Sequence, residues 1–337
     1  MPIGSRVKVG VIGCGEHAFE NLLPSLWTLD SVEVVALCDN DEAALRSAAE
    51  RFPRAKTYVD FHSLIENGGV AAIVAAAPPQ VHSGVAWESL KRGIHVFVEK
   101  PPTVTSEELS RLAAFADKAG LVTGVGHNLR HATASRELQR LIENPSFGRP
   151  LCMDMRYFAS KPVGDRWGLN SVLRSFLLSH ANHALDLMVC QMGQAESVSA
   201  IATPGPGGSI ALGAQIGFLS GAVGNLLVTT CSPHFSLSVT VVGDRATIAH
   251  MDGLRGLSEY GLEGDEKRWG HCWVERTLDS GYEHAGYQTE LSLFVDAVRG
   301  RGRMQPSFAD EQGVYVLIDQ IERQVLERVE SPGAVLG

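Results

Sequence analysis

The chain has no long hydrophobic run and no block of positive charge. No stretch approaches the roughly 18 consecutive apolar residues that a membrane helix needs, and the start, Met1 to Arg6, does not resemble a secretory signal. Its 29 Lys and Arg are outnumbered by 38 Asp and Glu, which gives a formal net charge of -9. A nucleic-acid partner would need clustered basic residues to neutralise its phosphates. We therefore expect no membrane association, no nucleic-acid partner and a cytoplasmic location.

Cysteine is sparse, and its spacing argues against a disulfide scaffold. No two cysteines form a C-x-x-C pair, and they lie too far apart for the dense framework of a small secreted domain. No internal repeat or low-complexity segment is apparent either. We expect the cysteines to be reduced and buried. They are Cys14, Cys38, Cys152, Cys190, Cys231 and Cys272.

What the chain does have is the composition of an ordinary globular protein. Of its 337 residues 45% are hydrophobic and 20% are charged. These values argue against a disordered, collagen-like or coiled-coil chain. Since domains usually hold roughly 100 to 200 residues, the length favours two domains.

The first part of the chain alternates short apolar runs with helical patterns. Strands separated by helices are typical of a parallel sheet covered on both faces. A capping box, Thr105 followed by Glu108, begins one of the helices, and Gly120 is placed to end it. The expected strands are Val7 to Ile12, Val32 to Cys38, Ala71 to Ala76, His95 to Val98 and Val122 to Gly126.

Beyond about Gly126 the pattern changes to one helix, Ala134 to Glu143, and then mainly strands. Neighbouring strands joined by Gly, Pro and Asp turns predict a mostly antiparallel sheet. Two helices close the chain, Thr289 to Arg299 and Ala309 to Val329. We therefore expect an α/β domain followed by an α+β domain. The strands of the second are Leu151 to Phe158, Val198 to Thr203, Ser209 to Phe218, Ala222 to Thr230, Ser236 to Val242 and Ala246 to Ala249.

The first expected strand runs into a glycine-rich turn, Gly13-Cys14-Gly15-Glu16-His17-Ala18. A G-x-G-x-x-A turn lets backbone N–H groups and a helix N-terminus meet a pyrophosphate, because glycine leaves no side chain in the way. Taken alone, the hexapeptide fits an ordinary strand-to-helix turn equally well.

Asp39 favours the dinucleotide interpretation of that turn. It ends the second expected strand about twenty residues later, where a carboxylate accepts both ribose hydroxyls of the adenosine half. The same charge would repel a 2′-phosphate, and no arginine follows it directly, so NAD is favoured over NADP. The alternative is a structural role as a helix N-cap, at Asp39 or Asn40.

A charged pair, Glu99 and Lys100, lies at the end of the fourth expected strand, in Val98-Glu99-Lys100-Pro101-Pro102. The carboxyl edge of a parallel sheet is where ligands bind. A lysine there suits a proton donor, since desolvation brings the lysine pKa toward neutrality. A solvated loop lysine fits Lys100 equally well.

Taken in order, these motifs resemble those of the glucose-fructose oxidoreductase, inositol dehydrogenase and rhizopine catabolism (Gfo/Idh/MocA) family. The resemblance spans nearly the whole chain, and the ordered set is far more specific than any single motif. Besides the turn, Asp39 and Glu99-Lys100-Pro101, it rests on Ala77-Pro78-Pro79-Gln80-Val81-His82, Gly126-His127-Asn128-Leu129-Arg130, Phe147-Gly148-Arg149-Pro150, His183-x-x-Asp186 and the pattern of Tyr287, Glu290, Phe294 and Ser307.

The resemblance implies an NAD-binding Rossmann domain over residues 1–125. It also implies that residues 126–337 form an α+β domain with a large, mostly antiparallel open sheet, which would bind substrate and build a homodimer or homotetramer. Substrate is expected between the two domains. The implied cofactor-binding residues are Gly13, Gly15, Glu16, His17, Asp39, Asn40, Ala77, Pro78, His82, Glu99, Lys100 and Asn128.

Two residues carry the chemistry that the resemblance implies. Lys100 matches the family's catalytic acid/base at the substrate oxygen, and Pro101 the residue often held in a cis peptide after it. His183 matches the histidine that binds the reacting hydroxyl, with Asp186 one helical turn further on. The alternative for His183 is a core histidine whose hydrogen bonds are satisfied.

The chain departs from the family four residues before His183, where many members carry an acid and this chain has Ser179. A hydroxyl can orient a substrate by hydrogen bonding but supplies no charge to balance Lys100. His180 either replaces the acid in part or faces a neighbour, since one helical residue turns a side chain by about 100°. We expect no metal site, because no further carboxylate or cysteine completes a ligand sphere there.

The loop from Pro162 to Arg174 precedes this helix and holds Trp167 among charged and amide side chains. A Trp ring face with fixed donors suits a polyol. The alternative is a surface loop whose Trp packs on the domain interface. The expected substrate-binding residues are Asp186, Ser179, His180, Trp167 and Arg174.

The resemblance therefore implies an NAD-dependent oxidoreductase that interconverts a secondary alcohol and a ketone. Its small polyhydroxylated substrate would be a sugar, aminosugar or cyclitol, free or nucleotide-linked. Two alternatives use the same fold: a non-catalytic NAD-binding regulator, like the galactose-regulon repressor, and redox-neutral glycoside cleavage in which NAD is never released. The presence of both Lys100 and His183 argues against the regulator.

Overall fold

The structure is a computed structural model that describes residues 6–161, 164–263, 266–268, 272–274 and 284–330. Contacts divide the chain into two compact units. Unit 1 is Met1–His131 with Asp279–Gln312, and unit 2 is Ala132–Leu278 with Gly313–Gly337. The domains expected from the sequence, 1–125 and 126–337, were defined by cofactor and substrate binding. They stay a prediction, because the units above are defined by contacts within the chain.

Unit 1 contains a six-stranded sheet, parallel throughout, in the order β3-β2-β1-β4-β5-β6. The order reverses between β1 and β4, and open parallel sheets bind ligands beyond the carboxyl ends of their strands at such a point. The strands are β1 (Val7–Ile12), β2 (Val32–Cys38), β3 (Lys56–Tyr58), β4 (Ala72–Ala75), β5 (His95–Glu99) and β6 (Thr123–Gly126).

Capping residues fix where the helices of unit 1 begin. The Thr105 side chain accepts a hydrogen bond from the backbone N–H of Glu108 at 3.3 Å, and Gly120 ends the same helix with a φ of 65°. Both ends were predicted, although the Glu108 carboxylate accepts from the Ser83 hydroxyl instead of completing the box. The helices are η1 (a π-helix, Ala18–Leu22), α1 (Leu23–Thr28), α2 (Glu42–Arg51), α3 (Phe61–Asn67), α4 (Pro79–Lys91), α5 (Ser106–Ala119), α6 (Asn128–His131) and α11 (Tyr287–Val298).

Helix α11 comes from far along the chain but completes the core of unit 1. Its Leu291 and Phe294 are fully buried in the same cluster as Val9 and Leu22. It packs against α1, η1, α6 and β6. The amphipathic pattern predicts the helix, but sequence order alone does not show which core it joins.

Unit 2 contains a nine-stranded sheet in the order β14-β13-β12-β11-β7-β10-β9-β8, with β15 also paired to β13. Only β7 and β10 are parallel among the described pairs, so the predicted mostly antiparallel sheet is confirmed. The strands are β7 (Pro150–Phe158), β8 (Ala195–Pro204), β9 (Ile210–Phe218), β10 (Val223–Thr229), β11 (Ser236–Gly243), β12 (Thr247–Asp252), β13 (Gly256–Glu263), β14 (Glu266–Arg268) and β15 (Cys272–Val274).

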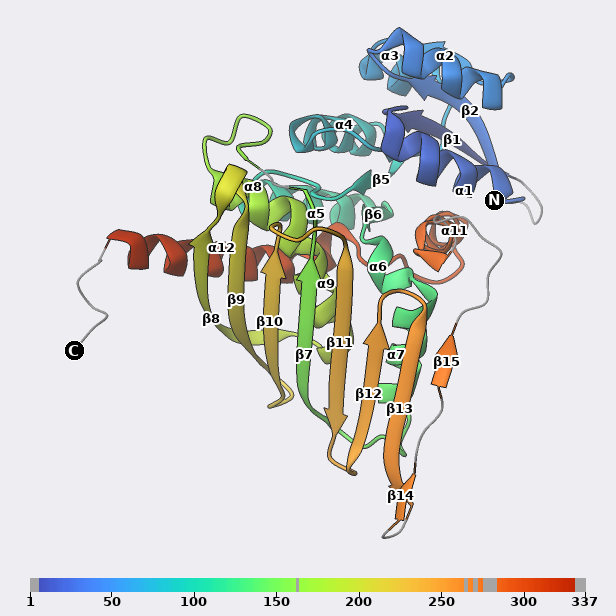
Figure 1. The fold of residues 1–337 in the computed structure, drawn as a ribbon. Helices are drawn as coiled ribbons and strands as arrows, with labels where there is room; N and C mark the ends of the chain where they lie inside the picture. Colours follow the sequence, from blue (N-terminus) through green and yellow to red (C-terminus); the bar gives the residue numbers. More distant parts are fainter. Residues whose placement is uncertain (1–5, 162–163, 264–265, 269–271, 275–283, 331–337) are drawn as a thin grey trace. The chain divides into compact units, whose positions relative to one another are not determined.

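Helices cover one face of this sheet. Met155, Val239 and Met251 are neighbours in register and are fully buried on that face. There α7 packs against β12 and β13, and α9 against β7 and β10 (Figure 1). On the opposite face Val223 and Leu227 are 59% and 43% exposed. The helices are α7 (Thr133–Ile142), α8 (Val172–Phe176), η2 (a π-helix, Leu177–Ala181), α9 (Asn182–Met192), η3 (a 3-10 helix, Pro206–Gly208) and α12 (Phe308–Glu330), which begins in unit 1.

Every strand expected from the sequence is present, but β3, β13, β14 and β15 were missed. Strand β3 has only three residues, two of them exposed, so it lacks the apolar run that marks a strand. Strand β13 contains two glycines and two glutamates among its eight residues, which weakens its alternation.

Burial of the cysteines was only partly predicted. Cys14 and Cys38 are buried thiols, Cys152 and Cys190 are half-buried, and Cys231 is exposed, so the expectation is wrong for Cys231. The side chain of Cys272 lies outside the described part of the chain.

The helices of the described segments were also compared with what a bilayer requires. Among them, none combines the length and the apolar character needed to span a membrane.

Candidate active site

The glycine turn after β1 is shaped by a neighbouring strand. Gly13 has a φ of 89°, and a Cβ there would lie 2.1 Å from the carbonyl oxygen of Ala76, so only glycine fits. At Gly15 a Cβ would meet no atom within 4 Å. Open space in front of such a turn is where a pyrophosphate reaches the backbone N–H groups. The turn therefore fits a dinucleotide.

Asp39 joins the ends of β1 and β2. Its Oδ2 accepts a hydrogen bond from the backbone N–H of Cys14 at 2.6 Å, and its Oδ1 accepts from that of Asp41 at 2.8 Å. The N-cap of α2 is Asp41, whose side chain accepts from the N–H groups of Ala43 and Ala44. The alternative that Asp39 or Asn40 caps this helix is therefore wrong.

A cavity of about 440 Å³ opens at this edge of the sheet. Half of the expected cofactor residues line it, whereas Glu16, His17, His82, Glu99, Lys100 and Asn128 do not. The sequence analysis missed its second acid, Asp60, which follows the unrecognised strand β3 and caps α3 by accepting from the N–H of Ser63. The lining residues are Ile12, Gly13, Gly15, Cys38, Asp39, Asn40, Val59, Asp60, Phe61, Ala76, Ala77, Pro78 and Val81.

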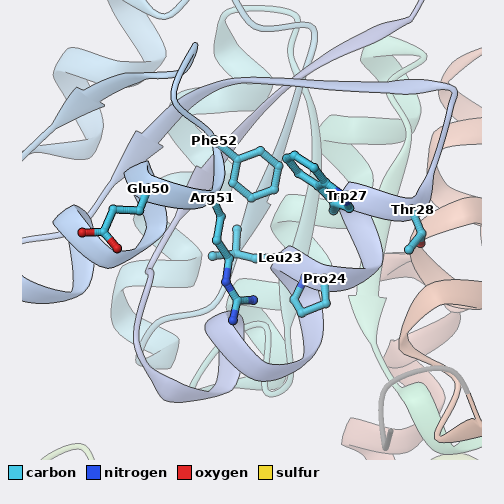
Figure 2. A pocket seen from close by; sticks show the side chains of 7 residues that line it. All are labelled: Leu23, Pro24, Trp27, Thr28, Glu50, Arg51 and Phe52. Carbon is cyan, nitrogen blue, oxygen red and sulfur yellow. The ribbon is translucent and has the colours of Figure 1, made fainter. Parts of the chain in front are cut away.

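A second hollow of unit 1, about 380 Å³, lies around Trp27 (Figure 2). The Trp27 and Phe52 rings meet edge to face with centroids 5.5 Å apart, and Trp27 is 66% exposed. Residues at the ends of α1 and α2 form it, shortly before β2 and β3 begin. It therefore lies toward the amino edge of the sheet, away from the edge that binds ligands in this architecture.

His82, on α4, connects two loops at the carboxyl edge. Its Nε2 accepts a hydrogen bond from the backbone N–H of Ala77 at 2.8 Å. The proton is therefore on Nδ1, which donates to the carbonyl oxygen of Pro101 at 3.0 Å. Burial lowers the pKa of His82 to about 4, so the ring is neutral. His82 thus fastens the loop after β4 to the loop that carries Lys100.

Glu99 ends β5 as a buried carboxylate paired with the turn. Its Oε1 lies 3.1 Å from Nε2 of His17, and a Cβ on Gly126 would lie 2.7 Å from its Cδ. Burial raises the pKa of Glu99, but the charges of His17 and Lys100 outweigh burial and hold it below its ordinary value. Burial alone would lower the pKa of His17. The carboxylate of Glu99 raises this pKa by more than burial lowers it, so the net shift is upward. Both directions favour an ion pair.

Lys100 follows this carboxylate directly. The Lys100–Pro101 peptide is cis, as the resemblance implied. The backbone N–H of Lys100 donates to Oε2 of Glu99 at 3.3 Å. Its positive charge also lowers the pKa of both His17 and His82. The fold therefore gathers one lysine, one carboxylate and two imidazoles at this edge.

In unit 2 the predicted pair of His183 and Asp186 lies on α9, one turn apart. Asp186 is fully buried, and the ring of the half-buried His183 stacks on that of Tyr157 with centroids 6.3 Å apart. Burial raises the pKa of Tyr157 to about 12. Its hydroxyl therefore keeps its proton near neutral pH.

Known proteins share this architecture. Residues 7–127 match the model of an oxidoreductase family with an NAD-binding Rossmann fold, and residues 135–249 match the GFO/IDH/MocA C-terminal domain. A solved dehydrogenase from Chromobacterium violaceum is 33% identical, with a TM-score of 0.93 over 98% of both chains. The chain belongs to the Gfo/Idh/MocA family.

Two further relatives of this Gfo/Idh/MocA oxidoreductase differ in coverage. An inositol 2-dehydrogenase from Burkholderia multivorans is 25% identical over 343 residues, which cover 98% of this chain and 97% of that protein. A 1-carboxy-3-chloro-3,4-dihydroxycyclohexa-1,5-diene dehydrogenase from Comamonas testosteroni is 35% identical over 145 residues. That match covers 42% of this chain and 36% of the relative, so it spans about a third of the relative's length.

The departure of this Gfo/Idh/MocA chain at Ser179 lies in the π-helical segment η2. The Ser179 Oγ hydrogen-bonds to the carbonyl oxygen of Ser175 and lies 2.9 Å from Nδ1 of His180. The His180 ring is buried and stacks on Phe176 with centroids 6.4 Å apart. Single π turns within α-helices are often found at functional sites. Both side chains have partners inside unit 2, so their substrate roles stay predictions.

Arg174 has a partner that the sequence analysis did not foresee. Its Nη1 lies 2.7 Å from Oδ1 of Asp319 and 3.0 Å from Oε2 of Glu322, both on α12. Trp167 has a φ of 59°, a left-handed conformation that bulky residues rarely adopt. Residues 162–163 of this loop lie outside the described residues. Binding of substrate by Trp167 and Arg174 stays a prediction.

A buried His127–Glu311 pair supports the start of α12. His127 Nε2 lies 3.1 Å from Oε1 and 3.0 Å from Oε2 of Glu311, and both side chains are almost fully buried. Next to it, the Asn128 side chain donates to the carbonyl oxygen of Ala285 at 2.9 Å. The motif Gly126-His127-Asn128 is visible in the sequence, but its partners lie more than 150 residues away and leave no local pattern there.

Proposed function

We propose that this protein is an NAD-dependent dehydrogenase that interconverts a secondary alcohol and a ketone on a sugar, aminosugar or cyclitol. The observation that carries the proposal is Lys100, which the fold places beside a buried carboxylate and two imidazoles at the ligand edge of a dinucleotide-type sheet. A lysine side chain at such an edge can act as an acid/base catalyst on a bound substrate.

NAD is the cofactor we propose, in preference to NADP. Two carboxylates, Asp39 and Asp60, line the cavity next to the glycine turn. Asp39 keeps lone pairs for ribose hydroxyls, since each of its oxygens accepts one backbone N–H. Two negative charges would repel a 2′-phosphate more strongly than the one charge expected from the sequence.

The proposed mechanism divides the work between cofactor and protein. When bound, NAD would supply the hydride acceptor for oxidation of the carbinol carbon. Lys100 takes the proton of the same hydroxyl, and His183 holds that oxygen by a hydrogen bond. Tyr157 keeps the His183 ring in place by stacking. The neutral His82 fixes the main chain next to Lys100 through Pro101.

The names of the relatives support the substrate class. Inositol and the dihydroxycyclohexadiene both carry hydroxyls on six-membered carbon rings. We therefore propose a ring-borne secondary alcohol with neighbouring hydroxyls, free or nucleotide-linked. The test follows NADH absorbance when the purified protein and NAD are mixed with each of a panel of cyclitols, sugars and aminosugars, with Lys100→Ala as the control. Binding of NAD without NADH formation with any of these compounds would contradict the proposal.

We also propose that the open sheet face of unit 2 pairs two copies of the chain. Val223 and Leu227 leave apolar surface exposed on that face, and exposed apolar patches mark interaction sites. Light scattering of the purified protein tests this: Val223→Arg should lower the molecular mass, and a monomeric wild type would contradict it. The expected cytoplasmic location stays a prediction.

A further inference from the structure

The Glu99 carboxylate has one negative charge and three basic neighbours. His17 lies 3.1 Å away, and Lys100 and His82 act on its charge as well. His82 does not compete for this charge near neutral pH, because burial lowers its pKa to about 4. The charge of Glu99 is therefore shared between His17 and Lys100.

The surroundings of Glu99 keep its carboxylate in place. The side chain is 8% exposed, and its carboxyl group lies where a Cβ of Gly126 would be, with 2.7 Å to Cδ. The carboxylate therefore fills the space that the glycine leaves open, and its movement to solvent would break the ion pair with His17. A carboxylate held in place stabilises the charged forms of both His17 and Lys100, and these two cations repel each other.

His17, in contrast, is open to protons from solvent. Its side chain is 46% exposed, while one edge of the ring packs against Tyr287 with centroids 5.5 Å apart. The charged groups that act on it are Glu99, Lys100 and, within its own helix, Glu20. The side chain of Asn21, 3.5 Å from its Nδ1, is neutral. Of these groups, Glu99 and Lys100 connect His17 to the proposed chemistry.

We propose that His17 is a positioning residue that controls the protonation of Lys100 by sharing the carboxylate of Glu99 with it. This inference rests on the proposed function, because it assumes that the protonation of Lys100 matters for turnover. It adds regulation of the lysine by pH to the cofactor contact that the resemblance implies for His17.

The direction of the effect follows from the mutual nature of charge interactions. Lys100 lowers the pKa of His17, so a protonated His17 must lower the pKa of Lys100 by the same interaction. A protonated His17 also draws on the charge of Glu99 that otherwise stabilises the ammonium. As pH falls and His17 gains its proton, Lys100 therefore gives up its own proton more readily than an isolated lysine beside Glu99 would.

The direct test measures the reactivity of the Lys100 amine in the protein without substrate. An uncharged amine-reactive reagent labels the protein, and mass spectrometry of the peptide that contains Lys100 gives the rate. At about pH 6, where a histidine with a raised pKa is charged, Lys100 of the wild type should react about three to ten times faster than in His17→Gln. At about pH 9, where His17 is neutral, the two rates should agree. Lys118, exposed on α5, is the internal control in the same digest.

Two further variants test the route of the coupling. In a Glu99→Gln background the added change His17→Gln should alter the labelling of Lys100 by roughly twofold or less, since burial without the carboxylate disfavours the charged form of His17. His234→Gln, which removes an exposed histidine of unit 2, should leave the labelling rates of Lys100 at both pH values unchanged. Equal labelling of Lys100 in wild type and His17→Gln at both pH values would overturn the proposal.

A second measurement does not depend on the stability of any His17 variant. In Lys100→Met the imidazole of His17, followed by NMR, should titrate at higher pH than in the wild type, because the repelling charge is removed. An unchanged titration would overturn the coupling. Failure of the proposed function looks different, since full turnover in Lys100→Ala would leave these labelling and NMR results intact.

Discussion

The carboxylate of Asp39 accepts the backbone N–H of Cys14, with 2.6 Å between Oδ2 and nitrogen. Asp39, which we propose as the determinant of NAD specificity, therefore also anchors the glycine turn that is expected to bind the pyrophosphate. Burial, with the nearby charge of Asp39, raises the pKa of the Cys14 thiol to about 12. That thiol stays protonated and adds no negative charge to the turn.

Cofactor choice gives the first prediction. Binding constants should show a clear preference for NAD over NADP. Asp39→Ser should reduce the difference between the two affinities, chiefly by raising the affinity for NADP, because a charge that repels the 2′-phosphate is removed. Asp39→Asn is the sharper variant, since its side-chain oxygen can still accept from Cys14. Asp41→Asn, which changes only the cap of α2, is the matched control and should keep the wild-type ratio. Equal or tighter binding of NADP by the wild type would contradict the account.

Loss of the proposed acid/base gives the second prediction. Lys100→Ala should lower kcat by about 100-fold to 10,000-fold, the usual contribution of general acid/base catalysis. Its affinity for NAD should stay close to that of the wild type, because Lys100 does not line the cavity that fits the dinucleotide. Steady-state kinetics and NAD titration check both parts; a variant that keeps full kcat would place the acid/base elsewhere.

The order of importance in unit 2 gives the third prediction. His183→Ala should impair kcat/KM severely. Ser179→Ala should cost roughly tenfold or less, since a neutral hydrogen bond is usually worth about 0.5 to 1.5 kcal/mol and this hydroxyl is already bonded to Ser175. A Ser179→Ala loss equal to or larger than that of His183→Ala would mean that the serine acts in proton transfer.

The buried His82 gives a prediction about stability and pH. In the unfolded chain its pKa is about 6.5, whereas burial lowers it to about 4 in the folded protein. Between these values only the unfolded state gains a proton, so the free energy of unfolding should fall by about 1.4 kcal/mol per pH unit as pH drops.

Urea unfolding at several pH values between 4 and 6.5 tests this stability window. His82→Gln should be less stable overall but should lose most of this slope, while His234→Gln should keep it. A His82→Gln variant with the slope of the wild type would show that other groups cause the acid sensitivity.

The sequence predicted what depends on local patterns and missed what depends on distant partners. The glycine turn, Asp39 and Lys100 lie at strand ends, and those strands are recognisable as segments of four to seven mostly apolar residues. Asp60 was missed because β3 is too short to show such a run. The ion pair of His17 with Glu99 and the bonds of Arg174 to α12 join residues far apart in the chain. Such pairings leave no periodic trace in one sequence.

The central claim is net oxidation of a carbinol carbon at the expense of NAD, and transfer of a labelled hydrogen tests it most directly. The purified protein is incubated with NAD and a cyclitol deuterated at its carbinol carbons, and NADH and ketone are followed by mass spectrometry. The account predicts deuterated NADH and ketone in equal amounts, both strongly reduced in Lys100→Ala. Cleavage of a matching glycoside without net NADH, or tight NAD binding with no transfer to any polyol, would contradict it.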